Sequence, residues 1–254
     1  MVNLKDEIQS RGFRVVHCKT DSVKVENPSD ELCEFIVEYG LKYGYQFEIE
    51  HVFDRICLVN DAVYIAKLAE DDPDDPGKWT ATGTQFQVPY VFKTLFSKEE
   101  IVFDDLCETK SVTTALYLRN NDPDAEEVII DPLTGKETTI KVGDKPEFIG
   151  RVGRFCPIKP GHGGKELIRE SKDKDGNVKY ASATGAKGYL WLEAEAVYAF
   201  KEKRDAIDYS YYNKLVDDAV ETISQFGDFE LFVSDDPIPY NYMRLKELDT
   251  PPWE

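Results

Sequence analysis

A single aspartate stands between two short apolar runs in the stretch FRVVHCKTDSVKV, residues 13 to 25. Both runs are rich in β-branched residues, so they predict two strands with Asp21 in the turn that joins them. A carboxylate at a rigid hairpin tip can hold a divalent cation beside a phosphate, because Mg²⁺ prefers oxygen ligands. The alternative is an Asx turn, in which the Asp21 side chain bonds to the backbone of its own turn. The residues alone leave both interpretations open.

A second chemical feature is the basic stretch, Lys145 to Lys187. It contains ten Lys and Arg against five Asp and Glu, although the whole chain has a formal charge of −18. That overall charge excludes a protein that coats nucleic acid with its whole surface. A local basic track facing a polyanion remains compatible with it. The alternative is a solvated loop region, with the glycine-rich run near Lys159 acting as a structural Gly-Pro turn.

Length and composition predict a globular chain. With 254 residues, 41% of them hydrophobic, the chain is long enough for one large domain or two modest ones. No apolar run approaches the roughly 20 residues that span a bilayer, so no membrane association is expected. The five cysteines lie far apart and form no CxxC pair, which is typical of reduced thiols rather than of disulfides or a zinc site.

The elements that position Asp21 follow from the periodicity of the first half. A short helix is expected at residues 4 to 10, ending at Gly12, and a second helix is expected after a capping Ser29. FEIEHVFDRICLVNDAVYIAKL predicts two or three strands, and WTATGTQF predicts another. A further helix begins near Pro89.

In the second half, the spacing of Ser97 and Glu100 predicts a capping box, and we expect DDLCETKSVTTALYL to continue as a helix. Two hairpins are expected, with turns at residues 132 to 135 and at Asp175-Gly176. DYSYYNKLVDDAVETISQFG predicts a long amphipathic helix, and FELFVS predicts a strand. Polar residues and proline place a domain boundary near residues 120 to 124.

Three segments together resemble family B DNA polymerases. VVHCKTDSVKV resembles the third polymerase motif, which reads aromatic-x-Asp-Thr-Asp-Ser before a strand. FEIEHVFDRICLVNDAVYIAKL is similar to the segment that carries the lysine-tyrosine motif, and TATGTQFQVPYVFKTLF is similar to the strand and helix that lead into the thumb. The segments follow one another in the family's order over residues 10 to 97. The later segments GRVGRFCPIKPG and DDAVETISQFGDFELFVSDD look most like polymerases of tailed bacteriophages.

This resemblance implies an α+β fold that corresponds to the end of a polymerase. The expected domains are a C-terminal portion of the palm at 1–88, with an antiparallel hairpin plus helix, a helical thumb portion at 89–122, and an α+β thumb or C-terminal extension at 123–254. The implied activity is DNA-directed nucleotidyl transfer with two Mg²⁺ ions, acting on primer-template DNA and deoxynucleoside triphosphates in the cytoplasm of a bacterial host cell.

The resemblance also assigns roles to individual residues. Asp21 matches the metal-binding second aspartate of the third motif, and Tyr64 matches the tyrosine near the primer terminus. Lys19 replaces the motif's first aspartate, where it is expected to contact phosphate or to pair with Asp21. Asp61 and Ala62 replace the family's paired lysines. The further residues expected to contact DNA are Lys67, Lys93, Arg151, Arg154 and Lys159.

The first palm motif and the nucleotide-binding helix have no counterpart before residue 13. We therefore expect a partner chain that carries the first two palm motifs and an exonuclease, and we expect the isolated chain to be inactive. One alternative is a non-catalytic DNA-binding or interaction module left from a split or truncated polymerase. Another is an unrelated acidic α+β protein.

Overall fold

The computed structural model describes residues 1–120, 126–130, 132–141 and 146–235. They form two compact units: unit 1 joins Met1–Gln87 to the segment that begins at Val220, and unit 2 is Val88–Ala219. The first division lies one residue from the expected end of the palm portion. The boundary expected near residues 120 to 124 falls largely outside the described residues.

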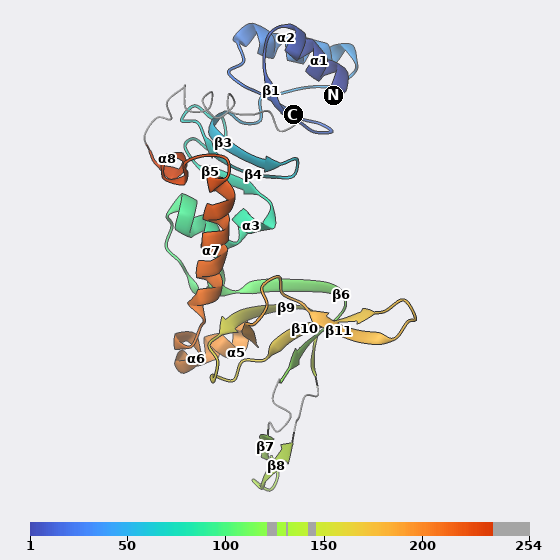
Figure 1. Cartoon of the computed structure of the whole chain (residues 1–254), viewed down its shortest axis with the longest axis vertical. Helices are drawn as coiled ribbons and strands as arrows, with labels where there is room; N and C mark the ends of the chain where they lie inside the picture. The colour runs from blue at the N-terminus through green and yellow to red at the C-terminus, as the bar shows by residue number, and fades with distance from the viewer. Residues whose placement is uncertain (121–125, 131, 142–145, 236–254) are drawn as a thin grey trace. The chain divides into compact units, whose positions relative to one another are not determined.

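Helices and antiparallel sheets alternate along the chain (Figure 1), and every strand pairing among the described residues is antiparallel. The α+β prediction is therefore confirmed at this level. In the described ranges, no helix is long and apolar enough to cross a bilayer.

The first part of unit 1 is the predicted helix–hairpin–helix. Its elements are α1 (Val2–Ser10), β1 (Val15–Cys18), β2 (Val23–Val25) and α2 (Asp30–Lys42). Gly12 follows α1 with φ +89, a left-handed conformation that costs glycine little. The Ser29 hydroxyl accepts a 3.3 Å hydrogen bond from the Leu32 amide, which is the predicted cap of α2. Leu4, Ile8 and Leu32 form the buried core beneath the hairpin.

The second part of unit 1 is a three-stranded sheet of order β3-β4-β5, formed by Phe53–Asn60, Val63–Leu68 and Trp79–Thr82. The short helix α3 (Thr84–Gln87) follows it. The prediction of a strand at FELFVS is wrong, because Phe229–Val233 forms helix α8. Asp228 caps this helix by accepting a 2.9 Å hydrogen bond from the Leu231 amide.

Unit 2 begins with two short helical segments, α4 (Pro89–Phe92) and η1 (Lys93–Ser97), where a helix was expected. The capping box at Ser97 does not form, because Lys98 takes a left-handed conformation with φ +57 and ends η1. After a single 3₁₀ turn, η2 (Phe103–Leu106), the chain enters strand β6 (Glu108–Arg119). The helix predicted there is wrong: the β-branched run from Val112 to Thr114 favours a strand, and β9 and β10 pair with it on both sides.

The sheet of unit 2 has the order β11-β10-β6-β9-β12. Its remaining strands are Val178–Ser182, Glu166–Lys172, Glu147–Ile158 and Leu190–Glu193, in that order. The expected hairpin at Asp175-Gly176 joins β10 to β11, and the hairpin around residues 132 to 135 is formed by β7 (Glu126–Ile130) and β8 (Glu137–Lys141). The glycine-rich run near Lys159 follows the end of strand β9 at Ile158 and forms a loop.

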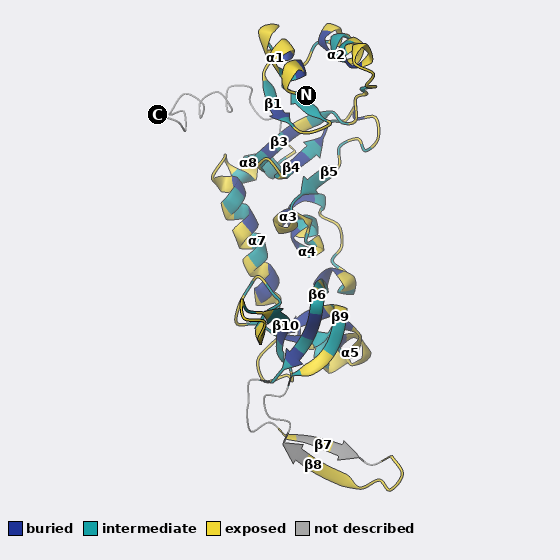
Figure 2. Cartoon of the chain, turned by 90° about the vertical axis from the view of Figure 1, so that its right-hand side faces the viewer, coloured by how far each residue is buried: buried dark blue, intermediate teal, exposed yellow. Residues whose placement is uncertain are grey.

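Three helices complete unit 2: α5 (Ala194–Ala199), α6 (Lys201–Asp205) and most of α7 (Tyr209–Ser224). The long α7 helix was predicted, and Tyr211 and Tyr212 of its first turn are buried against the sheet. Trp191, for which base stacking was an alternative, is also in this core at 1% exposure. Figure 2 shows buried residues on β6 and β10 of this sheet, and the last four residues of β9, Phe155 to Ile158, are buried as well.

Candidate functional site

Asp21 lies in the turn of the β1–β2 hairpin, as predicted. The turn is closed by a 2.9 Å hydrogen bond from the Lys19 amide to the Ser22 carbonyl, and both Lys19 and Asp21 are exposed. Within the described ranges, no hydrogen bond or ion pair engages the Asp21 carboxylate. An Asx turn requires such a bond to the backbone, so the hairpin leaves both Asp21 oxygens available to a ligand.

The hairpin is attached to the turn between β3 and β4 through His17. Its Nε2 lies 3.1 Å from the Asp61 carbonyl oxygen, and the residue is only 8% exposed. The Asn60 side chain accepts hydrogen bonds from the amides of Ala62 and Val63 and so fixes that turn. The first two segments of the polymerase resemblance therefore meet directly.

Lys24 brings the hairpin to Tyr64. Its Nζ lies 5.2 Å from the centroid of the Tyr64 ring and 5.6 Å from that of Phe53. Burial lowers the pKa of Lys24, as does the nearby charge of Lys19, while Glu50 opposes them. Burial and the charge of Glu50 raise the pKa of Tyr64.

Lys24 was not among the residues singled out from the sequence. The pattern that could have identified it is a lysine between two valines on a three-residue strand, because side chains on a strand alternate between its two faces. Val23 and Val25 pack against the core, which directs Lys24 to the other face.

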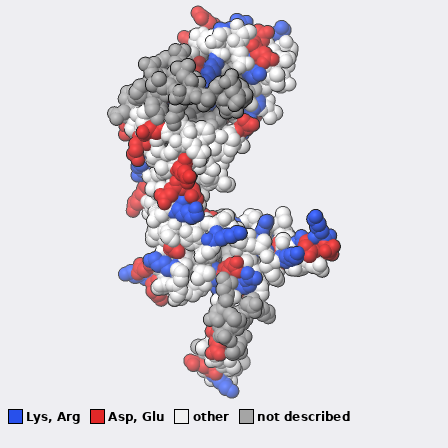
Figure 3. Space-filling model, viewed as in Figure 1, with Lys and Arg blue, Asp and Glu red and all other residues white. Residues whose placement is uncertain are grey.

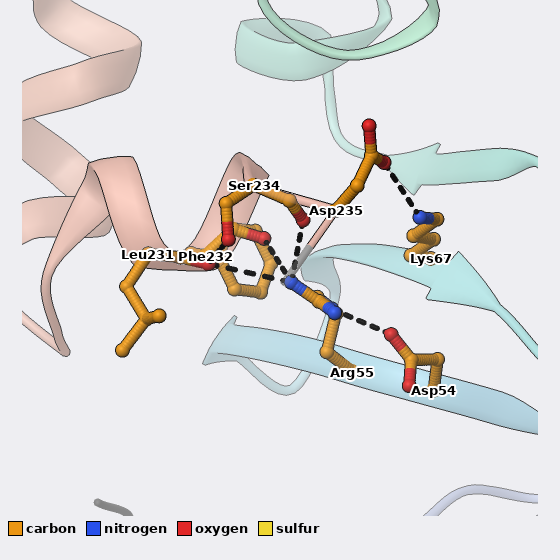
Figure 4. Close-up of polar contacts among 7 residues, drawn as sticks. All are labelled: Asp54, Arg55, Lys67, Leu231, Phe232, Ser234 and Asp235. Atoms are coloured by element: carbon orange, nitrogen blue, oxygen red, sulfur yellow. Dashed lines mark hydrogen bonds and ion pairs between the residues drawn. The ribbon is translucent and has the colours of Figure 1, made fainter. Parts of the chain in front are cut away.

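Lys67 lies on the same strand as Tyr64 but at odd spacing, so it points to the opposite face. There its Nζ lies 3.1 Å from Asp235 Oδ1, beyond the end of α8 (Figure 4). The Lys67 side chain is 15% exposed, whereas that of Asp235 is fully exposed. Lys67, which was expected to contact DNA, therefore forms an ion pair on the face away from Tyr64.

Arg55 holds α8 to the same sheet. Its Nη1 donates to the carbonyls of Leu231, Phe232 and Ser234 at 3.3, 3.2 and 2.9 Å (Figure 4). Its Nε donates to Asp54 at 2.6 Å, and the side chain is 5% exposed. Carbonyl groups at a helix C-terminus lack intrahelical partners, so a buried arginine satisfies several of them at once. No local pattern predicts this contact, because it joins residues far apart in the chain.

Asp72 is the buried carboxylate of unit 1. It accepts hydrogen bonds from the amides of Val52, Asp74 and Asp75 at 2.7, 3.1 and 2.9 Å. Burial alone would raise the pKa of Asp72, but these three donors and the nearby His51 outweigh it and lower the pKa. Asp72 thus fixes the acidic turn after β4.

The described residues contain no group of three or more histidine, cysteine or carboxylate side chains arranged to hold a metal ion. Asp21 fits the chemistry of one Mg²⁺ ligand, since its oxygens are exposed and unbonded within that part of the chain. The remaining ligands of a two-metal site are not brought to it there.

Lys93 belongs to unit 2 and is largely internal. Its Nζ lies 2.9 Å from Asp105 Oδ2, with the two side chains 20% and 7% exposed. The same Asp105 oxygen accepts a 2.8 Å hydrogen bond from the Val102 amide. Contact of Lys93 with DNA stays a prediction, and any such contact would compete with Asp105.

The three cations expected to bind DNA in the basic stretch differ in their surroundings. Arg154 pairs with Asp104 at 2.6 Å, and Lys159 donates to the Asp205 carbonyl at 3.3 Å. Arg151 is exposed on β9, and its guanidinium has no ion pair or hydrogen bond with another described residue. Lys145, the start of the stretch, lies outside the described ranges.

Acidic side chains accompany the basic ones across unit 2. Lys165 pairs with Glu147 at 2.7 Å and Lys179 with Asp173 at 3.5 Å. On the face seen in Figure 3, blue and red side chains are intermingled. Three cations of the stretch, Arg154, Lys165 and Lys179, are therefore ion-paired with carboxylates.

An aromatic cluster lies on one face of the unit 2 sheet. The Tyr117 ring centroid lies 5.6 Å from that of Phe148 and 5.4 Å from that of Tyr180. Phe148 and Tyr180 are 65% and 44% exposed. The Tyr117 hydroxyl donates to Glu170 at 3.1 Å. Sequence reasoning missed this cluster because its members lie on separate strands whose pairing only the fold defines.

Comparison with known proteins identifies no relative: no family model, no curated protein and no solved structure matches this chain.

Proposed function

We propose that this chain is the C-terminal palm-and-thumb portion of a phage DNA-directed DNA polymerase, which acts with a second chain or segment that supplies the other metal ligands. The observation that carries the proposal is the geometry of the hairpin. Asp21 is held at its tip with free oxygens, and His17 and Lys24 attach the same hairpin to the strands that bear Tyr64. Two of the three segments that carry the resemblance thus lie against each other.

In this proposal each residue of the hairpin has a distinct task. Asp21 holds one side of a Mg²⁺ pair, which activates the primer hydroxyl and stabilises the charge on the triphosphate when bound. Lys19, exposed beside Asp21, contacts a phosphate oxygen. Tyr64 supports the primer terminus, and Lys24 holds the Tyr64 ring in place through a cation–π contact.

Primer extension tests the proposal. The 254-residue chain is assayed with Mg²⁺ and all four deoxynucleoside triphosphates, alone and after addition of a chain that carries the first two palm motifs. We expect extension only from the mixture. Template-directed extension by this chain alone would contradict the split-enzyme proposal, and an inactive mixture of two folded, associated chains would count against polymerase function.

The second candidate is a non-catalytic module that binds single-stranded DNA, and the exposed aromatic cluster favours it. Bases stack on aromatic rings with little sequence preference, and each stacked base contributes about 1–3 kcal/mol. Under this hypothesis, Phe148→Ala and Tyr180→Ala each weaken binding of single-stranded DNA about tenfold, as measured by fluorescence anisotropy. Equal affinity of wild type and both variants would exclude the cluster as a base-stacking surface.

A further inference from the structure

Two of the five cysteines lie against each other in unit 2. The Sγ atoms of Cys107 and Cys156 are 3.5 Å apart, although the residues are 49 positions apart in the chain. Cys156 is buried, whereas Cys107 is half-buried and also lies 3.3 Å from the Phe103 carbonyl oxygen. The remaining three cysteines have no such neighbour within the described residues.

The strand register explains why these thiols meet. The β6–β9 ladder pairs Glu108 with Phe155, and antiparallel pairing places Cys107 opposite Cys156 one step further. Directly opposed residues in an antiparallel pair have Cα atoms about 4.5–5.5 Å apart. Disulfides form across Cα distances of about 4.4–6.8 Å, so this register is compatible with an S–S bond between Cys107 and Cys156.

The two thiols have different surroundings. The hydrogen bond with Cys156 lowers the pKa of Cys107, and the charge of Arg154 lowers it further, against the opposing effects of burial and Asp104. The hydrogen bond with Cys107 and burial raise the pKa of Cys156. Thiolates are the reactive form of cysteine. Cys107 is the more exposed of the two thiols and is therefore suited to attack, and the buried Cys156 to resolve.

We propose that Cys107 and Cys156 form a peroxide-sensitive dithiol that closes to a disulfide across β6 and β9. In the first step the Cys107 thiolate attacks a peroxide oxygen: an S–O bond forms, the O–O bond breaks, and hydroxide leaves. The sulfur is oxidised to a sulfenic acid and the peroxide is reduced. In the second step Cys156 loses its proton and attacks that sulfur. The S–S bond forms, the S–O bond breaks, and the hydroxyl leaves with the proton as water.

This inference does not depend on polymerase function, since it rests only on the two sulfurs and the register of the sheet. The enclosed segment contains the β7–β8 hairpin, and cross-linking its ends restricts the unfolded chain. The oxidised form is therefore expected to unfold at a higher urea concentration than the reduced form.

The test uses the full chain, fully reduced and then treated with hydrogen peroxide. Thiols are blocked by alkylation in denaturant, and peptides are separated by mass without reduction. We expect a linked peptide pair containing Cys107 and Cys156, with a mass lower by two hydrogen atoms than the sum of the two thiol peptides. Intermolecular disulfides, or oxidation of Cys18 or Cys33 in preference to this pair, would overturn the proposal.

Two variants assign the roles. In Cys156→Ala the resolving thiol is absent, so Cys107 should accumulate as a sulfenic acid that dimedone captures. In Cys107→Ala no linked pair forms, and dimedone labelling of Cys156 should be at least tenfold lower. Cys33→Ala is the matched control, because Cys33 is also half-buried and should leave the linked pair unchanged. The wild-type peptide map does not depend on the folding of any variant, and absence of the linked pair there would falsify the proposal.

Discussion

The hairpin of unit 1 and the basic stretch of unit 2 differ in whether their charged side chains have polar partners. In unit 1, Asp21 and Lys19 stand exposed at a turn held by backbone bonds, and the Asp21 oxygens are free within the described residues. In the basic stretch of unit 2, Arg154 and Lys165 form ion pairs with Asp104 and Glu147. A charged side chain that is already ion-paired is less available to a ligand, because the ligand must displace its partner before it can bind. Basic residues clustered in sequence therefore need not form a binding surface.

The largest expected effect concerns the free carboxylate. In an enzyme reconstituted with a chain that carries the first two palm motifs, Asp21→Asn should lower nucleotide incorporation at least about a thousandfold, because an amide is a much weaker Mg²⁺ ligand than a carboxylate. The unfolding transition should not change. Single-turnover primer extension measures the first effect and urea denaturation the second.

The matched control is Asp71→Asn, another exposed aspartate in a turn of unit 1. Its activity should equal that of the wild type. If Asp21→Asn retains more than a tenth of the activity, the hairpin tip is not the metal site and the contrast between the units loses its functional meaning.

The next effect concerns Lys93 of unit 2, which is ion-paired with Asp105. Lys93→Met removes the partner of a nearly buried carboxylate, so it should lower the free energy of unfolding by roughly 2–3 kcal/mol. Asp105 keeps its bond from Val102, which limits the loss. Urea denaturation followed by circular dichroism measures it.

Binding of duplex DNA distinguishes the two possible tasks of Lys93. If Lys93 contacts DNA as predicted, Lys93→Met should weaken duplex binding; if its ammonium group stays with Asp105, the variant should bind with the affinity of the wild type. A loss of affinity without a loss of stability would show that Lys93 leaves Asp105 to contact DNA, and that its ion pair does not prevent ligand binding.

A smaller effect is expected from the basic stretch. Reversal of Arg151, Arg154 and Lys159 to Glu should weaken duplex binding about tenfold at low salt and reduce the salt dependence of the affinity. Arg151→Glu alone should account for most of this change, since Arg151 is the one of the three without a described polar partner. Fluorescence anisotropy across a salt series provides the measurement.

Lys136→Glu is the control for the charge reversals, since Lys136 is exposed beside the β7–β8 turn of the same unit. It should have little effect on affinity. Equal affinities for the wild type and the triple variant would identify the basic stretch as solvated surface with internal ion pairs.

The smallest effect is the pH dependence of protein stability that comes from Asp72, the buried carboxylate that accepts three backbone hydrogen bonds in unit 1. Its folded pKa is lowered, so its stabilising contribution is complete above the unfolded value near 3.9 and is lost as the pH falls through the folded value. The wild type should therefore exceed Asp72→Asn in urea midpoint at pH 7, and the difference should shrink at pH 3. A difference that stays constant over this range would show that the carboxylate charge does not stabilise the turn.

Local sequence determined the helix caps and the hairpin turn of unit 1. Ser29 caps α2, Gly12 follows α1, and Asp21 lies in the hairpin turn, because each depends on neighbours within a few residues. The long helix α7 was equally predictable from its apolar period. The tip of the candidate site therefore follows from sequence alone.

Tertiary structure decided the elements whose local signals compete. The segment of β6 has the spacing of a capping box before it, yet pairing with β9 and β10 satisfies its backbone and makes it a strand. FELFVS has a strand composition, yet Asp228 caps it as a helix and Arg55 bonds its end. The partners of β6 lie far away in the chain, where no local pattern can report them. In α8 the Asp228 cap is local, and only the Arg55 contact is distant.

The candidate site also combines residues that local sequence predicts with contacts that only the tertiary structure decides. The identity of Asp21 and Tyr64 as candidates came from the sequence, but the Lys24 contact that joins their segments depends on how a hairpin and a sheet pack. The commitment of Lys67 and Lys93 to acidic partners depends on packing as well. Sequence determined which charged groups the chain carries, and the fold alone decided which of them are free, because that depends on distances between residues that the chain order leaves open.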